Sequence, residues 1–208
     1  MAMEWFIKVD SLIKKHYLTN MLRLLWKLYW KITGWKIAGS FPYHHPQMVL
    51  IIAPHTSSKD VVVGFAARNE LKIYHAKFLG KKELFDGPFG FLFRWLGGTP
   101  VDRFSKQGMV EQAATLFAEN KNFLLAMAPE GTRKRVDKLR SGFYHIAKKA
   151  QVPILPVGLD FEKKQLVIGT PLFTTDDEAA DFKNIIAFFS TIKGANPDYD
   201  LRHLKDIE

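Results

Sequence analysis

The 208-residue chain contains no cysteine, which excludes disulfides and thiolate chemistry and agrees with a reducing compartment. It also lacks any uncharged apolar run of about 18 residues, so no transmembrane helix is expected. No apolar segment followed by a small-residue cleavage site lies near Met1, which argues against a signal peptide. The length and the balance of apolar and charged residues predict one globular domain with a substantial core.

Acidic residues are missing between Asp10 and Asp60, although the chain as a whole carries a net charge of +9. Seven basic residues fall in this gap: Lys14, Lys15, Arg23, Lys27, Lys31, Lys36 and Lys59. A positive region of this kind favours an anionic partner, which can be a nucleic acid, anionic lipid headgroups or a phosphorylated substrate.

Residues 18–36 have the periodicity of a helix with a basic edge and an opposite apolar arc. Two tryptophans lie where the faces meet, as in helices that lie in a membrane interface, although a helix packed on the domain with a solvated basic edge has a similar pattern. We favour a membrane-docking segment over residues 1–40. Its predicted docking residues are Arg23, Trp26, Lys27, Trp30 and Lys31. Nucleic acid is disfavoured, because no helix-turn-helix, zinc-finger or RNP signature occurs.

Residues 41–208 alternate between short apolar runs and helical patterns, which predicts an α/β fold. We expect a single layered domain with a mostly parallel or mixed central sheet flanked by helices, preceded by the amphipathic N-terminal helical segment. The predicted strands are 48–54, 71–76, 122–130, 153–160 and 164–170. The predicted helices are 57–70, 81–97 with a break at Gly87-Pro88, 105–120 beginning at Ser105, 139–150, and 176–194. For the last helix, Thr175 and Glu178 form a possible capping box and Gly194 a stop.

The stretch APHTSSKD, residues 53–60, follows an apolar strand and contains His55 and Asp60. Ser57 and Asp60 match an ordinary helix cap, so the carboxylate can serve only the helix N-terminus. Alternatively, His55 lies at the carboxyl end of a strand, where open α/β sheets bind ligands, with Asp60 fixing its tautomer. No Gly-x-Ser-x-Gly motif supplies a nucleophile. Such a dyad suits direct transfer, in which the histidine deprotonates a substrate hydroxyl.

Three further blocks follow the dyad: GGTPVDR (97–103), APEGTR (128–133) and VPILPV (152–157). The H-x4-D pair and these blocks occur in the order and spacing of PlsC-like glycerolipid acyltransferases, the lysophosphatidic acid acyltransferase family. The chain resembles this family over about residues 45–170. Each block is a weak signal alone, but four in the same order form a specific pattern.

The resemblance implies an O-acyltransferase in which His55 is the general base and Asp60 holds and polarises it. By the same resemblance, the acceptor-binding residues are Arg103, Glu130, Gly131, Thr132 and Arg133. The implied partners are a lysophospholipid such as lysophosphatidic acid, an acyl-CoA or acyl carrier protein donor, and an anionic membrane surface. No cofactor and no metal is expected. A protein acting on such lipids is expected at the cytoplasmic face of a membrane, as a peripheral or monotopic protein.

Three alternatives stay open at this level. The acceptor can be a lyso-aminolipid or another lysolipid, and the chain can be a catalytically silent lipid-binding module. A metal-dependent hydrolase built on His44, His45 and His55 is disfavoured, because adjacent histidines rarely share one ion and no H-E-x-x-H motif occurs. The apolar segment 89–97 is either part of a docking surface and acyl groove or ordinary core packing.

Overall fold

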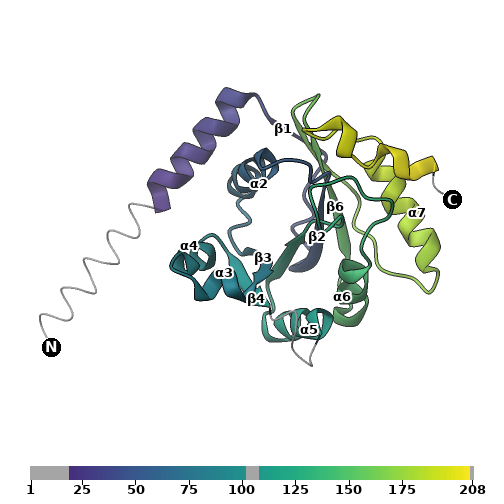
Figure 1. Cartoon of the computed structure of the whole chain (residues 1–208). Helices are drawn as coiled ribbons and strands as arrows, with labels where there is room; N and C mark the ends of the chain where they lie inside the picture. Colours follow the sequence, from purple (N-terminus) through teal and green to yellow (C-terminus); the bar gives the residue numbers. More distant parts are fainter. Residues whose placement is uncertain (1–18, 102–107, 207–208) are drawn as a thin grey trace, which may run out of the picture.

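The computed structural model describes residues 19–101 and 108–206, which form a seven-stranded sheet covered by helices (Figure 1). The strand order is β1-β7-β6-β2-β5-β3-β4, and every pairing is parallel except the antiparallel pair β6–β7. The strands are β1 (Lys36–Ala38), β2 (Gln47–Ala53), β3 (Ala76–Lys81), β4 (Gly98–Val101), β5 (Phe123–Met127), β6 (Ile154–Asp160) and β7 (Gln165–Ile168). The predicted mixed α/β sheet is confirmed.

Helices cover both faces of the sheet. They are α2 (Lys59–Glu70), α3 (Lys82–Asp86), α4 (Gly90–Trp95), α5 (Met109–Glu119), α6 (Gly142–Ala150) and α7 (Glu178–Phe189), with short 3-10 helices at Pro197–Tyr199 and Arg202–Asp206. Residues 19–33 are helical as well. Because side chains alternate along a strand, β2 sends Val49 and Ile51 into the core beneath α5, α6 and α7, and Met48 and Leu50 into the core beneath α2 and helix 19–33.

The centre of the sheet fixes the position of the functional loops. Strand β2 is flanked by β6 and β5, and its pairing with β5 runs in parallel register as far as Ile51 opposite Met127. The carboxyl ends of β2 and β5 therefore meet at one edge of the sheet. The loops that follow them, which carry His55 and Glu130, are brought side by side although 75 residues separate them.

Helix 19–33 packs on the domain through its aromatic residues and leaves much of its apolar arc exposed. Trp30 is only 7% exposed and contacts Trp35, while Trp26 stacks on Phe65 of α2. The expectation that Trp26 and Trp30 lie at a membrane boundary is therefore wrong for Trp30, which belongs to the core, and Trp26 is partly buried. No helix of the described residues has the length and apolarity needed to cross a membrane.

Several element boundaries differ from the prediction. The segment predicted as strand 71–76 is a turn, because Leu71 and Ile73 anchor it in the core while Lys72 adopts a left-handed φ of +56°; the strand is β3. The break at Gly87-Pro88 is confirmed, since α3 and α4 lie on either side of it. Strands β1 and β4 were not predicted. The Ser105 helix start lies outside the described residues.

The predicted ends of the last helix are wrong. Helix α7 is capped by Asp177, whose side chain accepts a hydrogen bond from the Ala180 amide, and not by a Thr175–Glu178 box. The helix ends at Phe189 rather than near Gly194. After the helix, Ile192 packs against Gly158, where a Cβ atom would come within 2.7 Å of its side chain.

Candidate active site

His55 and Asp60 form a close pair at the carboxyl end of β2. The Nδ1 atom of His55 lies 3.2 Å from Oδ2 of Asp60, whose side chain is almost fully buried. The same oxygen accepts the backbone N–H groups of Thr56 at 2.6 Å and Ser57 at 2.7 Å. Asp60 therefore holds the loop before α2 and lies against the imidazole. It does not cap the helix, whose N-cap is Ser58 with no side-chain cap bond, and the role of the pair in proton transfer stays a prediction.

Glu130 fixes the histidine from the neighbouring strand. Its Oε1 atom accepts the backbone N–H of His55 at 2.6 Å, and its Oε2 atom is buried without a hydrogen-bond partner. Burial raises the pKa of Glu130 to about 7, although the hydrogen bonds from the backbone amides of His55 and of Glu130 itself oppose this rise. The sequence predicted that Glu130 binds the acceptor; the structure shows it bonded to the loop that carries His55.

Arg133 reaches the other side of the imidazole. Its Nε–H donates to Nε2 of His55 at 3.3 Å. An arginine can only donate, so Nε2 acts as the acceptor and Nδ1 carries the proton directed at Asp60. The turn before Arg133 depends on Gly131, whose φ of +65° favours glycine. Thr132 and Gly131 both line the cavity described below.

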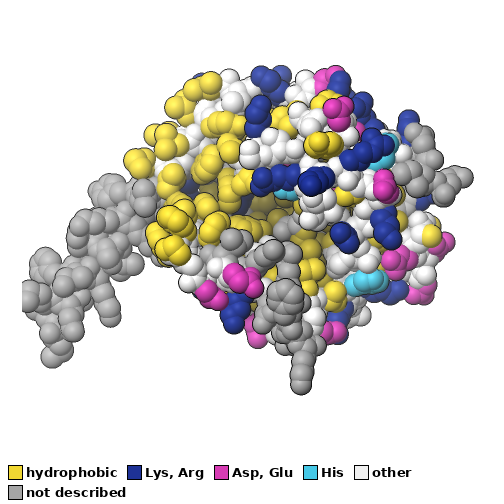
Figure 2. Space-filling model, in the orientation of Figure 1, with side chains coloured by type: hydrophobic (Ala, Val, Ile, Leu, Met, Phe, Trp, Pro, Cys, Tyr) yellow, Lys and Arg dark blue, Asp and Glu magenta, His cyan; other side chains and the backbone are white. Residues whose placement is uncertain are grey.

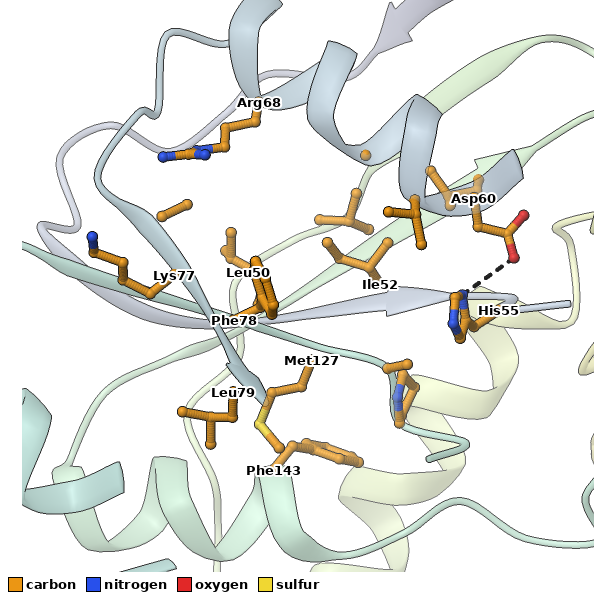
Figure 3. A pocket seen from close by; sticks show the side chains of 18 of the residues that line it. Leu50, Ile52, His55, Asp60, Arg68, Lys77, Phe78, Leu79, Met127 and Phe143 are labelled. Atoms are coloured by element: carbon orange, nitrogen blue, oxygen red, sulfur yellow. Dashed lines mark ion pairs between the residues drawn. The ribbon is translucent and has the colours of Figure 1, made fainter. Parts of the chain in front are cut away.

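A large apolar cavity begins at the dyad. It has a volume of about 1190 Å³ and is lined by α2, by the strands of the sheet and by residues at the start of α5 and α6, among them Met109 and Phe143. In Figure 3, the side chains of Ile52, Leu50 and Phe78 stand between His55 at one end and Arg68 at the other. Protein interiors contain few voids, and a space of this size lined by apolar side chains is typical of a ligand site.

Arg68 marks the end of the cavity away from the dyad. One guanidinium nitrogen donates to the Leu96 carbonyl at 2.8 Å and another to the Tyr74 carbonyl, which ties the end of α4 to the turn before β3. Its burial lowers the arginine pKa. Asp60, Gly64 and Arg68 follow one another at intervals of four along α2 and all line the cavity, so the helical period in the sequence already places them on one face.

One residue of the predicted site lies outside the described residues. Arg103 falls in the segment 102–107, so its position is not described. The backbone N–H of Asn196 donates to Thr56 Oγ1 at 3.0 Å, a support from the C-terminal region that no sequence motif indicated. The described residues contain no group of three His, Asp or Glu side chains able to hold a metal ion, so His44, His45 and His55 do not form the centre that the hydrolase alternative requires.

A largely parallel sheet, a His–Asp pair at its carboxyl edge and an adjoining apolar cavity are features that group-transfer enzymes with apolar substrates can have. The chain belongs to the acyltransferase family: the family's sequence pattern, described as Acyltransferase, matches residues 37–160, more than half of the chain. The protein is thus an acyltransferase.

The fold is also that of a solved structure, the 1-acyl-sn-glycerophosphate (LPA) acyltransferase PlsC from Thermotoga maritima. The two share 18% sequence identity and a TM-score of 0.53, and the similarity covers 92% of this chain and 80% of the other. At this identity the likeness establishes the PlsC-like fold. A search of curated proteins found no match.

Proposed function

We propose that this acyltransferase moves an acyl chain from acyl-CoA or an acyl carrier protein to the free hydroxyl of a lysophospholipid such as lysophosphatidic acid, at a membrane surface. The observation that carries this proposal is the His55–Asp60 pair, 3.2 Å apart, at the mouth of an apolar cavity. The lysophosphatidic acid acyltransferase activity named for the Thermotoga protein of the same fold supports the acceptor class.

In the proposed reaction, Nε2 of His55 takes the proton from the acceptor hydroxyl as the oxygen attacks the thioester carbonyl. The new C–O bond forms, the C–S bond breaks, and the departing thiolate takes the proton from the imidazolium. Asp60 holds the ring and stabilises its transient positive charge through Nδ1. Glu130 positions the His55 backbone, and no step needs a cofactor or a nucleophile from the protein.

The cavity is the proposed site of the acyl chain. Each CH₂ group moved from water to an apolar wall gains about 0.8 kcal/mol, so a long chain binds firmly without any polar contact. The thioester carbonyl is then held beside His55, at the mouth, while the chain extends along Ile52 and Phe78 (Figure 3). Gly131, Thr132 and Arg133 lie at the same mouth and are the proposed contacts for the anionic group of the acceptor, with Arg103 assigned by resemblance alone.

A bilayer is the proposed occupant of an exposed apolar face beside the Arg68 end of the cavity, which we call the docking face. It comprises residues of helix 19–33 and of α4 with its N-cap: Met21, Leu24, Leu25, Leu28, Ile32, Phe89, Phe91, Leu92 and Trp95. Ile32 is 74% and Phe91 71% exposed. Helix 19–33 thus packs its tryptophans against the domain and leaves most of its leucines exposed. A helix that only packs on a core would bury its leucines instead.

The surface beside the docking face is suited to anionic lipid. Figure 2 shows hydrophobic side chains gathered over helix 19–33 and α4, with Lys and Arg side chains next to them. Arg23, Lys27 and Lys31 are exposed on the same helix, and Arg23 lies over the Tyr74 ring. Apolar contact combined with attraction between basic residues and headgroups is the usual means of interfacial binding. The position on the cytoplasmic face and the division at residue 40 remain predictions.

The test is an acyl-transfer assay with the full chain. Labelled acyl-CoA and acyl carrier protein are each offered with lysophosphatidic acid, other lysophospholipids, a lyso-aminolipid and a neutral monoacylglycerol in mixed vesicles. We expect labelled phospholipid from anionic lysolipids and little product from the neutral acceptor. Binding of vesicles and acyl donors without turnover of any acceptor would instead establish the lipid-binding module.

A further inference from the structure

The nitrogen of His55 that must accept a proton is already occupied. Nε2 receives the hydrogen bond from Nε of Arg133 at 3.3 Å, while Nδ1 faces Asp60. The imidazole therefore has a partner on both sides, the carboxylate of Asp60 on one and the permanently charged guanidinium of Arg133 on the other. As long as Arg133 stays in this position, Nε2 has no free lone pair for a hydroxyl proton.

Arg133 is held to this position weakly. It is an exposed residue of the loop after β5, and no carboxylate among the described residues forms an ion pair with it. A phosphate or carboxylate binds a guanidinium through two short charge-assisted bonds, which are stronger than one bond to a neutral imidazole. An anionic ligand at the cavity mouth is therefore able to draw Arg133 from His55, whereas water or a neutral alcohol is not.

We infer that Arg133 is a specificity-determining residue that masks the catalytic base until the anionic group of the acceptor withdraws it. The inference rests on the proposed function and adds a coupling between acceptor recognition and base activation. Its consequence is protection of the bound thioester: water, which would form a free fatty acid and a thiol, meets an occupied Nε2. Recognition of the correct acceptor and suppression of hydrolysis thus depend on the same guanidinium.

The first experiment compares Arg133→Ala with Arg135→Ala, which removes the same charge from an exposed position two residues further along the loop. Acyl-CoA hydrolysis without acceptor is followed by thiol release, and the chain has no cysteine to react with the thiol reagent. We expect hydrolysis to rise roughly tenfold in Arg133→Ala, the value of one hydrogen bond to a charged group, and to stay at the wild-type rate in Arg135→Ala. An unchanged hydrolysis rate in Arg133→Ala, with only weaker acceptor binding, would overturn the inference.

A second readout does not depend on turnover. Diethyl pyrocarbonate acylates unprotonated imidazole nitrogens, and its reaction at His55 is measured by peptide mass spectrometry relative to the exposed His44. Unmasking predicts faster modification of His55 in Arg133→Ala than in the wild type or Arg135→Ala. Equal rates in all three proteins would overturn the mask even if acyl transfer is observed. A faster rate without acyl transfer by the wild type would uphold the mask and reject the proposed function.

Discussion

Asp60 combines two roles in one carboxylate oxygen. Oδ2 accepts the amides of Thr56 and Ser57 and lies beside Nδ1 of His55, whereas Oδ1 is buried without a partner. The side chain can therefore be changed so that its charge is lost while its contacts are kept, which separates the chemical role from the structural one.

Asp60→Asn tests that separation. The amide oxygen can accept the same three hydrogen bonds, so the fold should survive, but the developing imidazolium loses its counter-charge. We expect kcat for acyl transfer to fall about 10²–10⁴-fold with a near-normal melting temperature, by analogy with the aspartate of hydrolase triads. Asp60→Ala serves as the contrast, because it leaves the Thr56 and Ser57 amides unpaired and should lower the melting temperature as well. Full activity in Asp60→Asn would reject the orienting role.

Glu130 gives a prediction for stability against pH. Its folded-state pKa of about 7 is above the ordinary 4.5, so between these values the folded chain keeps a proton that the unfolded chain has lost. The associated stabilisation is present at low pH and is lost as the pH rises through about 7. Glu130→Gln can keep the hydrogen bond to His55 and has no charge to bury. Between about pH 4.5 and pH 8, the wild type should lose up to roughly 3 kcal/mol more unfolding free energy than the variant in urea titrations. Parallel profiles would contradict this.

Among the elements, α2 determines the shape of the cavity. Asp60, Gly64 and Arg68 repeat every four residues along its inner face. The same helix therefore carries the partner of His55, a glycine that leaves space in the cavity, and the arginine at the far end of the cavity. A Cβ atom at Gly64 would meet no heavy atom within 4 Å, which leaves room for a larger side chain.

Gly64→Phe should fill the cavity, and Gly64→Ala is its control. The alanine variant should be more stable than the wild type by about 0.5–1 kcal/mol, because glycine is unfavourable within a helix, and it should retain transfer of long acyl chains. The phenylalanine variant should fold yet reduce kcat/KM for long chains far more than for short ones. Acyl-CoA donors of graded length provide the measurement, and an equal loss for all lengths would place the acyl chain elsewhere.

Local sequence patterns predicted the helices and strands better than they predicted which strands lie next to one another in the sheet. The His55–Asp60 pair was predictable because only four residues separate its members and a strand-to-helix turn brings them together. The contacts of Glu130 and Arg133 with His55 were not, because they depend on β2 lying next to β5, and periodicity does not specify strand order. The false strand at 71–76 has a similar cause: Leu71 and Ile73 are buried by tertiary packing, and burial alone resembles a strand pattern.

At the scale of the whole molecule, the proposed docking face adjoins the Arg68 end of the cavity, since Arg68 bonds the Leu96 carbonyl at the end of α4 and Arg23 lies over the Tyr74 ring. The prediction of a docking helix stays open, but the structure changes which residues it involves: Trp30 is in the core, and Leu24 and Leu28 are 66% and 50% exposed. Periodicity could not decide this, because a helix with apolar residues over much of its circumference can pack by either side.

Leu24→Gln combined with Leu28→Gln should weaken binding to anionic vesicles severalfold without lowering stability, because both side chains are already exposed. Co-sedimentation gives the bound fraction. Phe173→Gln is the matched control, since Phe173 is 56% exposed but follows Leu172, which bridges to Ile154 at the amino end of β6, away from the site. Equal binding by the wild type, the double variant and the control variant would contradict the proposal that the docking face binds a bilayer.

The most direct measurement of the central claim is a single-turnover assay of labelled acyl transfer to lysophosphatidic acid by the wild type and by His55→Ala. Because the imidazole is the only proton acceptor assigned to the attacking hydroxyl, we expect transfer by the variant to fall at least about 10²-fold while donor binding in the cavity is retained. Transfer at the wild-type rate by His55→Ala would contradict the mechanism.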